Sequence, residues 1–244
     1  IDTCGTGGDG SGTVNLSTAT AIVTASLGIA VAKHGNRAVS SRAGSADVLE
    51  ALGVNVAGDP AAVGRQIDEV GLGFLFAPRL HPAMKHAVEV RRALGVRTVF
   101  NLLGPLTNPA GATRQLLGVY DAALCEPLAR VLANLGCERA FVVHGAGGLD
   151  EVSPCGATHV AEVDRGQVRR FDFRPHEAGL DICAPADLRG GSAAENAAIL
   201  RDVLAGRPGP VADAVVLNTA FAAVLGGRAD GFETGAALAR EALA

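Results

Sequence analysis

The chain opens on a glycine-rich run, Gly5-Thr6-Gly7-Gly8-Asp9-Gly10-Ser11-Gly12-Thr13, which leads into Asn15-Leu16-Ser17-Thr18. Glycine lets the backbone approach a ligand closely and adopt positive φ angles. The hydroxyl-rich segment that follows is typical of a helix N-terminus, where free N–H groups and the helix dipole attract anions. The pattern therefore predicts a phosphate-binding loop.

Two common phosphate loops fit this run poorly. A P-loop requires a lysine after its last glycine, but the first lysine of the chain is Lys33. The dinucleotide spacing G-x-G-x-x-G occurs at residues 5–10, yet it also needs an acidic residue about 20 positions later. No acidic residue lies between Asp9 and Asp47, which argues against NAD. A glycine-rich surface turn without a ligand stays open until the next segment is considered.

A dense cluster of hydrogen-bond donors follows the apolar residues 29–32, which read as a buried strand. Its sequence is Lys33-His34-Gly35-Asn36-Arg37-Ala38-Val39-Ser40-Ser41, and Ala43-Gly44-Ser45-Ala46-Asp47 comes next. Ligands of open α/β sheets bind beyond the carboxyl ends of strands. A single Lys or His there has ordinary structural explanations, but so many donors beside a glycine loop favour phosphate binding.

Two adjacent carboxylates, Asp150 and Glu151, stand in a glycine-rich turn after the apolar run 139–143. Mg²⁺ prefers one or two carboxylates together with water and phosphate oxygens. Taken alone, the pair fits a solvated acidic turn better than a metal site. His144 has no partner at zinc-ligand spacing, and His81 and His86 do not have the i, i+4 spacing of a zinc helix.

Composition excludes several classes of protein. With 244 residues, 48% apolar and 4% aromatic, the chain predicts one large domain with a core of Ala, Val and Leu. A net charge of −4 without a basic block argues against nucleic-acid binding. The five cysteines form no C-x-x-C pair, so we expect reduced thiols and a cytoplasmic location. No apolar run reaches the about 18 residues of a membrane span.

Strand-like and helix-like segments alternate along the chain, which predicts an α/β fold with a mixed sheet. The predicted helices lie at about residues 17–27, 46–52, 60–70, 82–94, 122–135, 193–205, 210–225 and 230–243. The predicted strands lie at residues 29–32, 73–77, 98–101, 116–119 and 139–143, with a hairpin formed by residues 157–163 and 167–173. Gly28, Gly53, Gly71, Gly95 and Gly136 follow helical patterns, where C-terminal caps belong.

The motifs occur in an order that resembles the anthranilate phosphoribosyltransferase family of tryptophan biosynthesis. The resemblance rests on GTGGDG, NLST, KHGNRAVSS and GSADVLEALG, which span residues 5–53. It continues through His81-Pro82-Ala83-Met84, Arg91-Arg92, RTVFN at residues 97–101, LGPLTNP at residues 103–109, His144-Gly145 and GLDEVS at residues 148–153.

The resemblance implies a central, mainly parallel mixed sheet flanked by helices, of the nucleoside phosphorylase and phosphoribosyltransferase catalytic-domain type. Residues 1–244 would form the glycosyltransferase-family α/β catalytic domain. We expect the chain to be an excerpt of a larger enzyme, with the helix at 82–94 packing against an N-terminal helical region. The full-length family enzyme is expected to be a homodimer without nucleic-acid or membrane partners.

The resemblance also implies the reaction: transfer of the 5-phosphoribosyl group from phosphoribosyl pyrophosphate to the amino group of anthranilate, with release of pyrophosphate. Ser17, Asp150 and Glu151 would hold Mg²⁺, and Gly5, Asn36 and Arg91 would bind anthranilate. Lys33, Asn36 and the metal would stabilise the transition state. The residues expected at phosphoribosyl pyrophosphate are Gly5, Gly8, Asp9, Thr13, Asn15, Leu16, Ser17, Thr18, Lys33, His34, Gly35, Asn36, Arg37, Ala38, Val39, Ser40, Ser41 and Ser45.

Two alternatives remain beside this function. A pyrimidine nucleoside phosphorylase shares the fold class, although its donor cluster differs from KHGNRAVSS. A non-enzymatic relative that binds nucleic acid would be expected to have a basic surface and altered metal positions. Arg91 could also lie on a plain exposed helix face, and the roles of His34 and Asp9 stay open.

Overall fold

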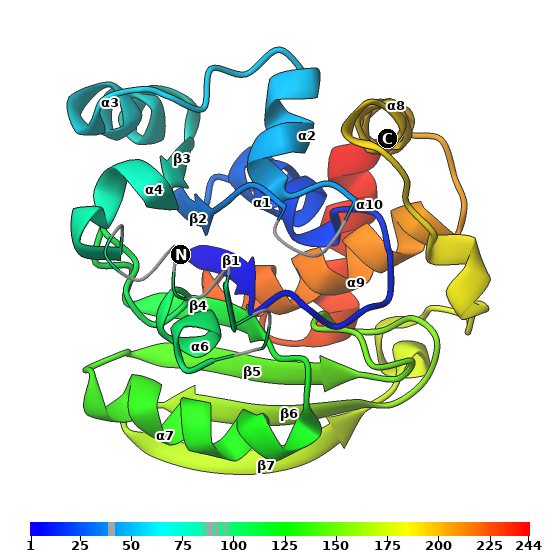
Figure 1. Ribbon diagram of the computed structural model, residues 1–244. Coiled ribbons are helices and arrows are strands. Elements are labelled where there is room, and N and C mark those ends of the chain that lie inside the picture. The colour runs from blue at the N-terminus through cyan, green and yellow to red at the C-terminus, as the bar shows by residue number, and fades with distance from the viewer. Residues whose placement is uncertain (39–41, 85, 87–89, 91–92, 95, 97) are drawn as a thin grey trace.

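The computed structural model describes the chain except for residues 39–41, 85, 87–89, 91–92, 95 and 97 (Figure 1). Its main sheet has five strands in the order β1-β4-β5-β6-β7. These strands are β1 (Asp2–Gly5), β4 (Arg114–Gly118), β5 (Arg139–Gly145), β6 (Thr158–Asp164) and β7 (Gln167–Phe173).

The sheet is mixed, as predicted. β1, β4 and β5 run parallel, and β6 and β7 are antiparallel to their neighbours. The predicted hairpin joins β6 to β7 through Arg165 and Gly166, both of which have positive φ angles. The parallel strands therefore present their carboxyl ends at one edge of the sheet.

A second, two-stranded parallel sheet pairs β2 (Val31–Gly35) with β3 (Leu72–Phe76). β2 lies beside β1, where the Ala32 N–H donates to the Ile1 carbonyl at 2.9 Å (Figure 1). This neighbourhood brings the carboxyl end of β2, with its donor cluster, to the carboxyl end of β1, with its glycine loop.

Most predicted helices are confirmed with small shifts at their ends. The α-helices are α1 (Leu16–Ser26), α2 (Ser45–Ala51), α3 (Pro60–Val70), α4 (Ala77–Leu80), α6 (Phe100–Leu103), α7 (Cys125–Asn134), α8 (Ala193–Leu204), α9 (Pro210–Leu225) and α10 (Phe232–Leu243). The 3₁₀ helices are η1 (Pro82–Met84), η2 (Ala122–Leu124), η3 (Pro175–Ala178) and η4 (Pro185–Leu188). Much of the predicted helix at 82–94, and Gly95, lie outside the described residues.

The strand predicted at residues 98–101 is wrong, because the chain forms α6 there. The Asn101 side chain accepts a hydrogen bond from the Thr98 N–H at 3.0 Å, and the Asn101 N–H donates to the Thr98 carbonyl at 3.0 Å. Val99 is 59% exposed, so the described part of the chain does not cover this segment as it would a core strand. A local helix-start pattern therefore overrides the β propensity of Thr, Val and Phe.

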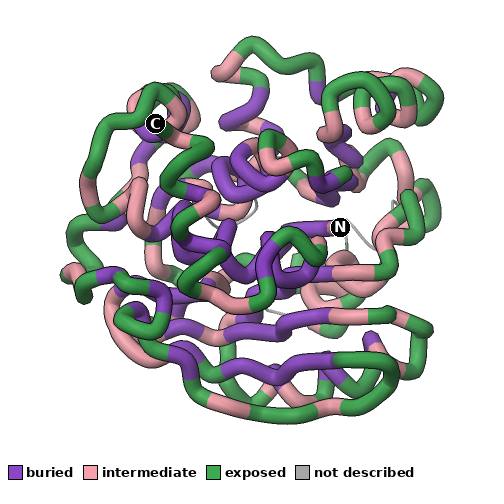
Figure 2. The backbone as a smooth tube through the Cα atoms, turned by 180° about the vertical axis from the view of Figure 1, so that it is seen from behind, coloured by how far each residue is buried: buried purple, intermediate pink, exposed green. Residues whose placement is uncertain are grey.

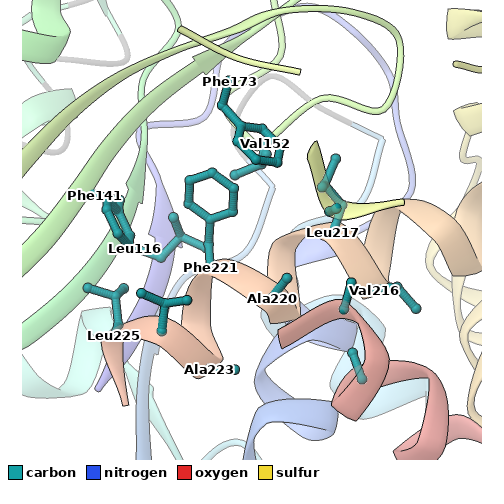
Figure 3. Packing of buried hydrophobic residues seen from close by; sticks show 14 of the residues in the cluster. Leu116, Phe141, Val152, Phe173, Val216, Leu217, Ala220, Phe221, Ala223 and Leu225 are labelled. Carbon is teal, nitrogen blue, oxygen red and sulfur yellow. The ribbon is translucent and has the colours of Figure 1, made fainter. Parts of the chain in front are cut away.

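The core lies on both faces of the main sheet (Figure 2). Alternate residues of β5 point to opposite sides, so that Phe141 packs toward α9 and Val142 toward α7. On the α9 side, the ring of Phe221 stands at 5.1 Å from that of Phe141 and 4.9 Å from that of Phe173 (Figure 3). α9 is buried along most of its length, and α1 packs against it.

Candidate active site

The glycine loop connects the end of β1 to the start of α1 at the carboxyl edge of the sheet (Figure 1). Four of its glycines, Gly7, Gly8, Gly10 and Gly12, have φ angles between 64° and 73°, which explains why glycine is needed there. The far end of the loop is held by the Gly190 N–H, which donates to the Gly12 carbonyl at 2.9 Å. The loop is thus a shaped backbone surface at the helix start.

The acidic pair lies directly against this loop, although it is distant in sequence. Asp150 Oδ2 accepts the Gly7 N–H at 2.7 Å, and Glu151 Oε1 accepts the Ser17 N–H at 3.1 Å. Gly5 and Gly118 are register partners on β1 and β4, and a Cβ at either position would collide with Asp150. Two strand-end glycines therefore make room for Asp150 at the sheet edge, Gly5 for its carboxylate and Gly118 for its main chain.

Both carboxylates are held in an unfavourable environment for negative charge. Burial, and next the nearby Asp9, raise the pKa of Asp150 to about 7. Burial, and next Asp150, raise the pKa of Glu151 to about 8. Among the described residues, neither carboxylate has an ion-pair partner. Two adjacent carboxylates without a paired cation fit a divalent metal with oxygen ligands.

Lys33 supplies the nearest buried ammonium group and is only 2% exposed. Its Nζ donates to the Thr3 carbonyl at 2.7 Å and to Ser17 Oγ at 3.1 Å. Burial lowers the pKa of Lys33. Lys33 thereby fixes the hydroxyl of Ser17 at the start of α1, beside Glu151. Among the described residues, no three His, Cys, Asp or Glu side chains are grouped so that they could hold a metal ion by themselves, so a metal here would need Ser17, water and ligand oxygens as well.

Asp47 shapes the donor segment after β2. Its Oδ2 accepts the N–H groups of Ala38 and Gly44, both at 2.9 Å. Arg37 bonds the carboxylate of Glu50 at 2.6 and 2.7 Å and reaches Asp47 at 3.0 Å. The guanidinium of Arg37 is thus directed to α2, and its predicted contact with phosphate stays a prediction.

Three further predicted phosphate ligands, Asn15, Leu16 and Thr18, have side chains that are hydrogen-bonded to other parts of the protein or buried in it. The Asn15 side chain does not cap α1; its Oδ1 accepts from Asn196 Nδ2 at 2.9 Å and its Nδ2 donates to the Ala43 carbonyl at 3.3 Å. Leu16 and Thr18 are buried in the fold, at 1% and 0% exposure. A direct contact of Leu16 or Thr18 with a ligand would therefore have to involve backbone atoms.

His34 contacts a second histidine that the sequence did not single out as a site residue. Its Nε2 lies 3.1 Å from Nε2 of His81, with the rings edge to face. Burial, and next His81, lower the pKa of His34 to about 4, so His34 is neutral at pH 7. One of the two facing ring nitrogens can donate a hydrogen to the other, which joins β2 to the segment after α4.

A buried polar network behind the donor segment was also missed. Asp2 is fully buried; its Oδ1 accepts the His34 N–H at 3.1 Å and its Oδ2 accepts Asn108 Nδ2 at 2.8 Å. Asn108 Nδ2 also donates to the Ala32 carbonyl at 2.8 Å. Asp2 could have been found from the sequence, because an acidic residue within a buried strand needs hydrogen-bond partners. No local pattern could have paired it with Asn108.

The structure brings part of the predicted site together. Gly5, Asp9, Ser17, Lys33, Asp150 and Glu151 converge where β1, β2 and α1 meet, through the contacts of Gly7, Ser17 and Lys33. Asp9 Oδ1 also accepts the Ser11 N–H at 3.2 Å, which orders the loop. Arg91, Val39, Ser40 and Ser41 lie outside the described residues. The described helices include none that is both long and apolar enough to cross a membrane.

The architecture and the site match a class of transferase. A model of the glycosyl transferase family, a/b domain, matches residues 1–244. Anthranilate phosphoribosyltransferase of Moorella thermoacetica is 56% identical over 243 residues, which cover 100% of this chain and 72% of that protein. The corresponding protein of Desulfatibacillum aliphaticivorans is 54% identical over 243 residues, with the same coverage.

Solved structures agree with these relatives. Anthranilate phosphoribosyltransferase from Thermus thermophilus is 51% identical with a TM-score of 0.94, and the match covers 99% of this chain and 72% of that one. The enzyme from Saccharomyces cerevisiae in complex with PRPP and Mg is 34% identical with a TM-score of 0.89, covering 99% and 68%. The chain belongs to the anthranilate phosphoribosyltransferase family.

Proposed function

We propose that this chain is the α/β catalytic part of an anthranilate phosphoribosyltransferase of tryptophan biosynthesis. It would transfer the 5-phosphoribosyl group of phosphoribosyl pyrophosphate to the amino group of anthranilate and release pyrophosphate. The observation that carries the proposal is the contact of the Asp150–Glu151 pair with the glycine loop and the start of α1. Metal ligands and phosphate-binding backbone meet there at one point.

The chemistry of this transfer explains the composition of the site. As the bond to pyrophosphate breaks, negative charge accumulates on the diphosphate while the ribose acquires oxocarbenium character. Catalysis therefore needs positive charge and hydrogen-bond donors directed at the leaving group more than it needs a strong base. Loop N–H groups, Lys33 and Asn36 supply these donors. Mg²⁺ bound there would neutralise charge on the leaving diphosphate.

We assign Ser17, Asp150 and Glu151 to Mg²⁺. Ser17 is in place for this role because its Oγ accepts a hydrogen bond from Lys33 Nζ and its N–H donates to Glu151. The raised pKa values of Asp150 and Glu151 support the assignment, since a bound cation would favour their ionised forms. The yeast relative, solved with PRPP and Mg, supports the same choice of metal.

Anthranilate, a planar carboxylate, would bind beyond the diphosphate, with Gly5, Asn36 and Arg91 as its proposed contacts. Arginine suits this ligand because its planar fork can bond both oxygens of a carboxylate. Another yeast structure is in complex with 4-fluoroanthranilate, which supports a site for this substrate class. The set of phosphate ligands implied by the resemblance is proposed unchanged, including Arg37.

Further proposals concern the whole enzyme. Residues 1–244 would form one catalytic domain, and the helix at 82–94 would pack against helices outside this chain. The full-length enzyme would be a homodimer. It would act in the cytoplasm, a location supported by the five free cysteines.

The intrinsic fluorescence of anthranilate provides the test. With the full-length enzyme, fluorescence should decay only when both phosphoribosyl pyrophosphate and Mg²⁺ are present. Phosphorolysis of thymidine or uridine, assayed in parallel, should not occur. Unchanged anthranilate fluorescence under saturating substrates, or turnover of the nucleosides, would contradict the proposed function.

A further inference from the structure

Two cysteines outside the proposed active site lie with their sulfur atoms facing each other. Cys155 Sγ and Cys183 Sγ are 3.6 Å apart, although the residues are 28 positions apart in sequence. Both thiols are free and half-buried. Cys155 belongs to the turn that follows the acidic pair, and Cys183 to the loop that precedes η4. Sequence spacing alone gave no reason to pair them.

The backbone around each sulfur is fixed by hydrogen bonds. The Cys183 N–H donates to the Pro154 carbonyl at 3.2 Å, which joins the two segments directly. The Cys155 N–H donates to Ser153 Oγ at 3.1 Å, and that hydroxyl donates to the Ala146 carbonyl at 2.8 Å. The two thiols are therefore neighbours because the fold places their main chains side by side.

We propose that Cys155 and Cys183 form a redox-modification site that closes reversibly to an intramolecular disulfide by exchange with a small-molecule disulfide. The sulfurs must approach from 3.6 Å to the about 2.05 Å of a disulfide bond. The remaining cysteines offer no such pair: Cys4 and Cys125 are buried, and Cys137 Sγ donates to the Thr113 carbonyl.

The thiol–disulfide exchange takes place in two steps. The Cys155 thiolate attacks one sulfur of R–S–S–R, which forms a mixed disulfide and releases one R–S⁻ that takes up the proton of Cys155. The Cys183 sulfur, after losing its proton, then attacks Cys155 Sγ and releases the second R–SH. Two protein thiols are oxidised and one R–S–S–R is reduced to two R–SH. Burial, and next the hydrogen bond with Cys155, raise the pKa of Cys183 to about 12, which disfavours Cys183 as the first attacking thiolate.

The bond would enclose the β6–β7 hairpin, since residues 158–173 lie between the two cysteines. Closing a loop of this size restricts the unfolded chain. We therefore expect oxidation to raise the Tm of the enzyme by about 5 °C.

The test uses the full-length enzyme that carries this chain, incubated with glutathione disulfide, then digested with trypsin and analysed by mass spectrometry. The cross-linked peptides should be residues 140–165 and 171–189, each of which contains one cysteine. Dithiothreitol should separate them and reverse the rise in Tm. Cys155→Ser and Cys183→Ser should each abolish the cross-link and the shift in Tm, whereas the control Cys137→Ser should retain both.

Two results would overturn the proposal. One is glutathione attached to Cys137 or Cys155 without any cross-link between the two peptides, since the oxidant would then have reached the protein without closing the pair. The other is an equal rise in Tm for wild type and Cys183→Ser. Neither result bears on phosphoribosyl transfer, so the proposed function would stand independently.

Discussion

Asp150 and Glu151 are the residues on which the proposed chemistry depends most. Each accepts a backbone N–H from a segment more than a hundred residues away, and neither forms an ion pair among the described residues. Lys33 lowers the pKa of Glu151, but burial and Asp150 outweigh this effect. Such a pair is costly to ionise in the absence of a metal. The same arrangement that raises both pKa values also prepares the pair to bind Mg²⁺.

A pH-dependent stability follows from these shifts. The folded-state pKa values of about 7 and 8 lie above the ordinary carboxyl values of about 4, so the folded protein binds more protons than the unfolded chain between these limits. This contribution to stability is complete below about pH 4 and is lost as pH rises through 7 and 8. Without Mg²⁺, Asp150→Asn with Glu151→Gln should therefore be more stable than wild type at pH 9 and lose this advantage toward pH 5.

Thermal unfolding at several pH values measures this difference. The matched control is Asp68→Asn with Glu69→Gln, an adjacent pair exposed on α3. The control should follow wild type within the usual ±0.5 kcal/mol of a surface change. A parallel pH dependence for wild type and the Asp150/Glu151 variant would show that the pair is not strained in the folded protein.

Arg91 gives a second prediction at the residue scale. Arg91→Lys keeps the positive charge but loses the planar fork, so the KM for anthranilate should rise about tenfold or more while that for phosphoribosyl pyrophosphate changes little. Steady-state kinetics with each substrate varied in turn measures both constants. A defect confined to phosphoribosyl pyrophosphate would assign Arg91 to phosphate instead.

At the scale of elements, strand ends determine how the site is built. Gly5 and Gly118 stand side by side on β1 and β4, and both leave room for Asp150. At Gly118 a Cβ would overlap the carbonyl of Asp150, which is backbone and cannot turn aside. Because neither glycine has a side chain, the turn that holds Asp150 and Glu151 can lie against the ends of β1 and β4.

Gly118→Ala should displace the acidic turn. We expect a destabilisation of about 1–3 kcal/mol from overpacking, together with a weaker dependence of turnover on Mg²⁺. Gly104→Ala is the control, because a Cβ at Gly104 meets nothing within 4 Å and the residue has a helical φ of −51°. Denaturant unfolding and Mg²⁺ titration of activity measure the two effects. Equal behaviour of the two variants would contradict this account of the strand ends.

The sequence predicted the positions of the helices better than it predicted which residues contact one another. Helix periodicity and terminal glycines located α1, α3 and α9 to within a residue or two, because those signals are local. Residues 98–101 were misassigned because their exposure depends on tertiary packing. Asp2, Asn108 and His81 were missed as parts of the site because their partners come from other elements. The acidic pair was identified, but its contacts with Gly7 and Ser17 required the fold.

At the scale of the whole molecule, apolar side chains remain exposed along one stretch of the chain. Val90, Leu94, Val96 and Val99 are each more than half exposed. Exposed apolar patches beyond a few hundred Å² favour association. The family relatives are longer than this chain, which spans 72% of the proteins from Moorella thermoacetica and Desulfatibacillum aliphaticivorans.

Residues 1–244 expressed alone should therefore associate and be nearly inactive beside the full-length enzyme. Arg91 falls within the helix predicted at residues 82–94, and a displacement of about 1 Å in a substrate-positioning group can cost about 10²-fold in rate. Size-exclusion chromatography and the anthranilate assay, applied to both proteins, provide the comparison. A monodisperse excerpt with full turnover would mean that no further segment supports the anthranilate site.

The central claim is that Asp150 and Glu151 hold a metal against the diphosphate at the glycine loop. Isothermal titration of phosphoribosyl pyrophosphate into the full-length enzyme, with and without Mg²⁺, tests it most directly. The account predicts that Mg²⁺ strengthens binding to wild type and to the Asp68→Asn, Glu69→Gln control, but not to Asp150→Asn with Glu151→Gln, which should still bind the metal-free ligand. An equal gain from Mg²⁺ in all three proteins would contradict the account.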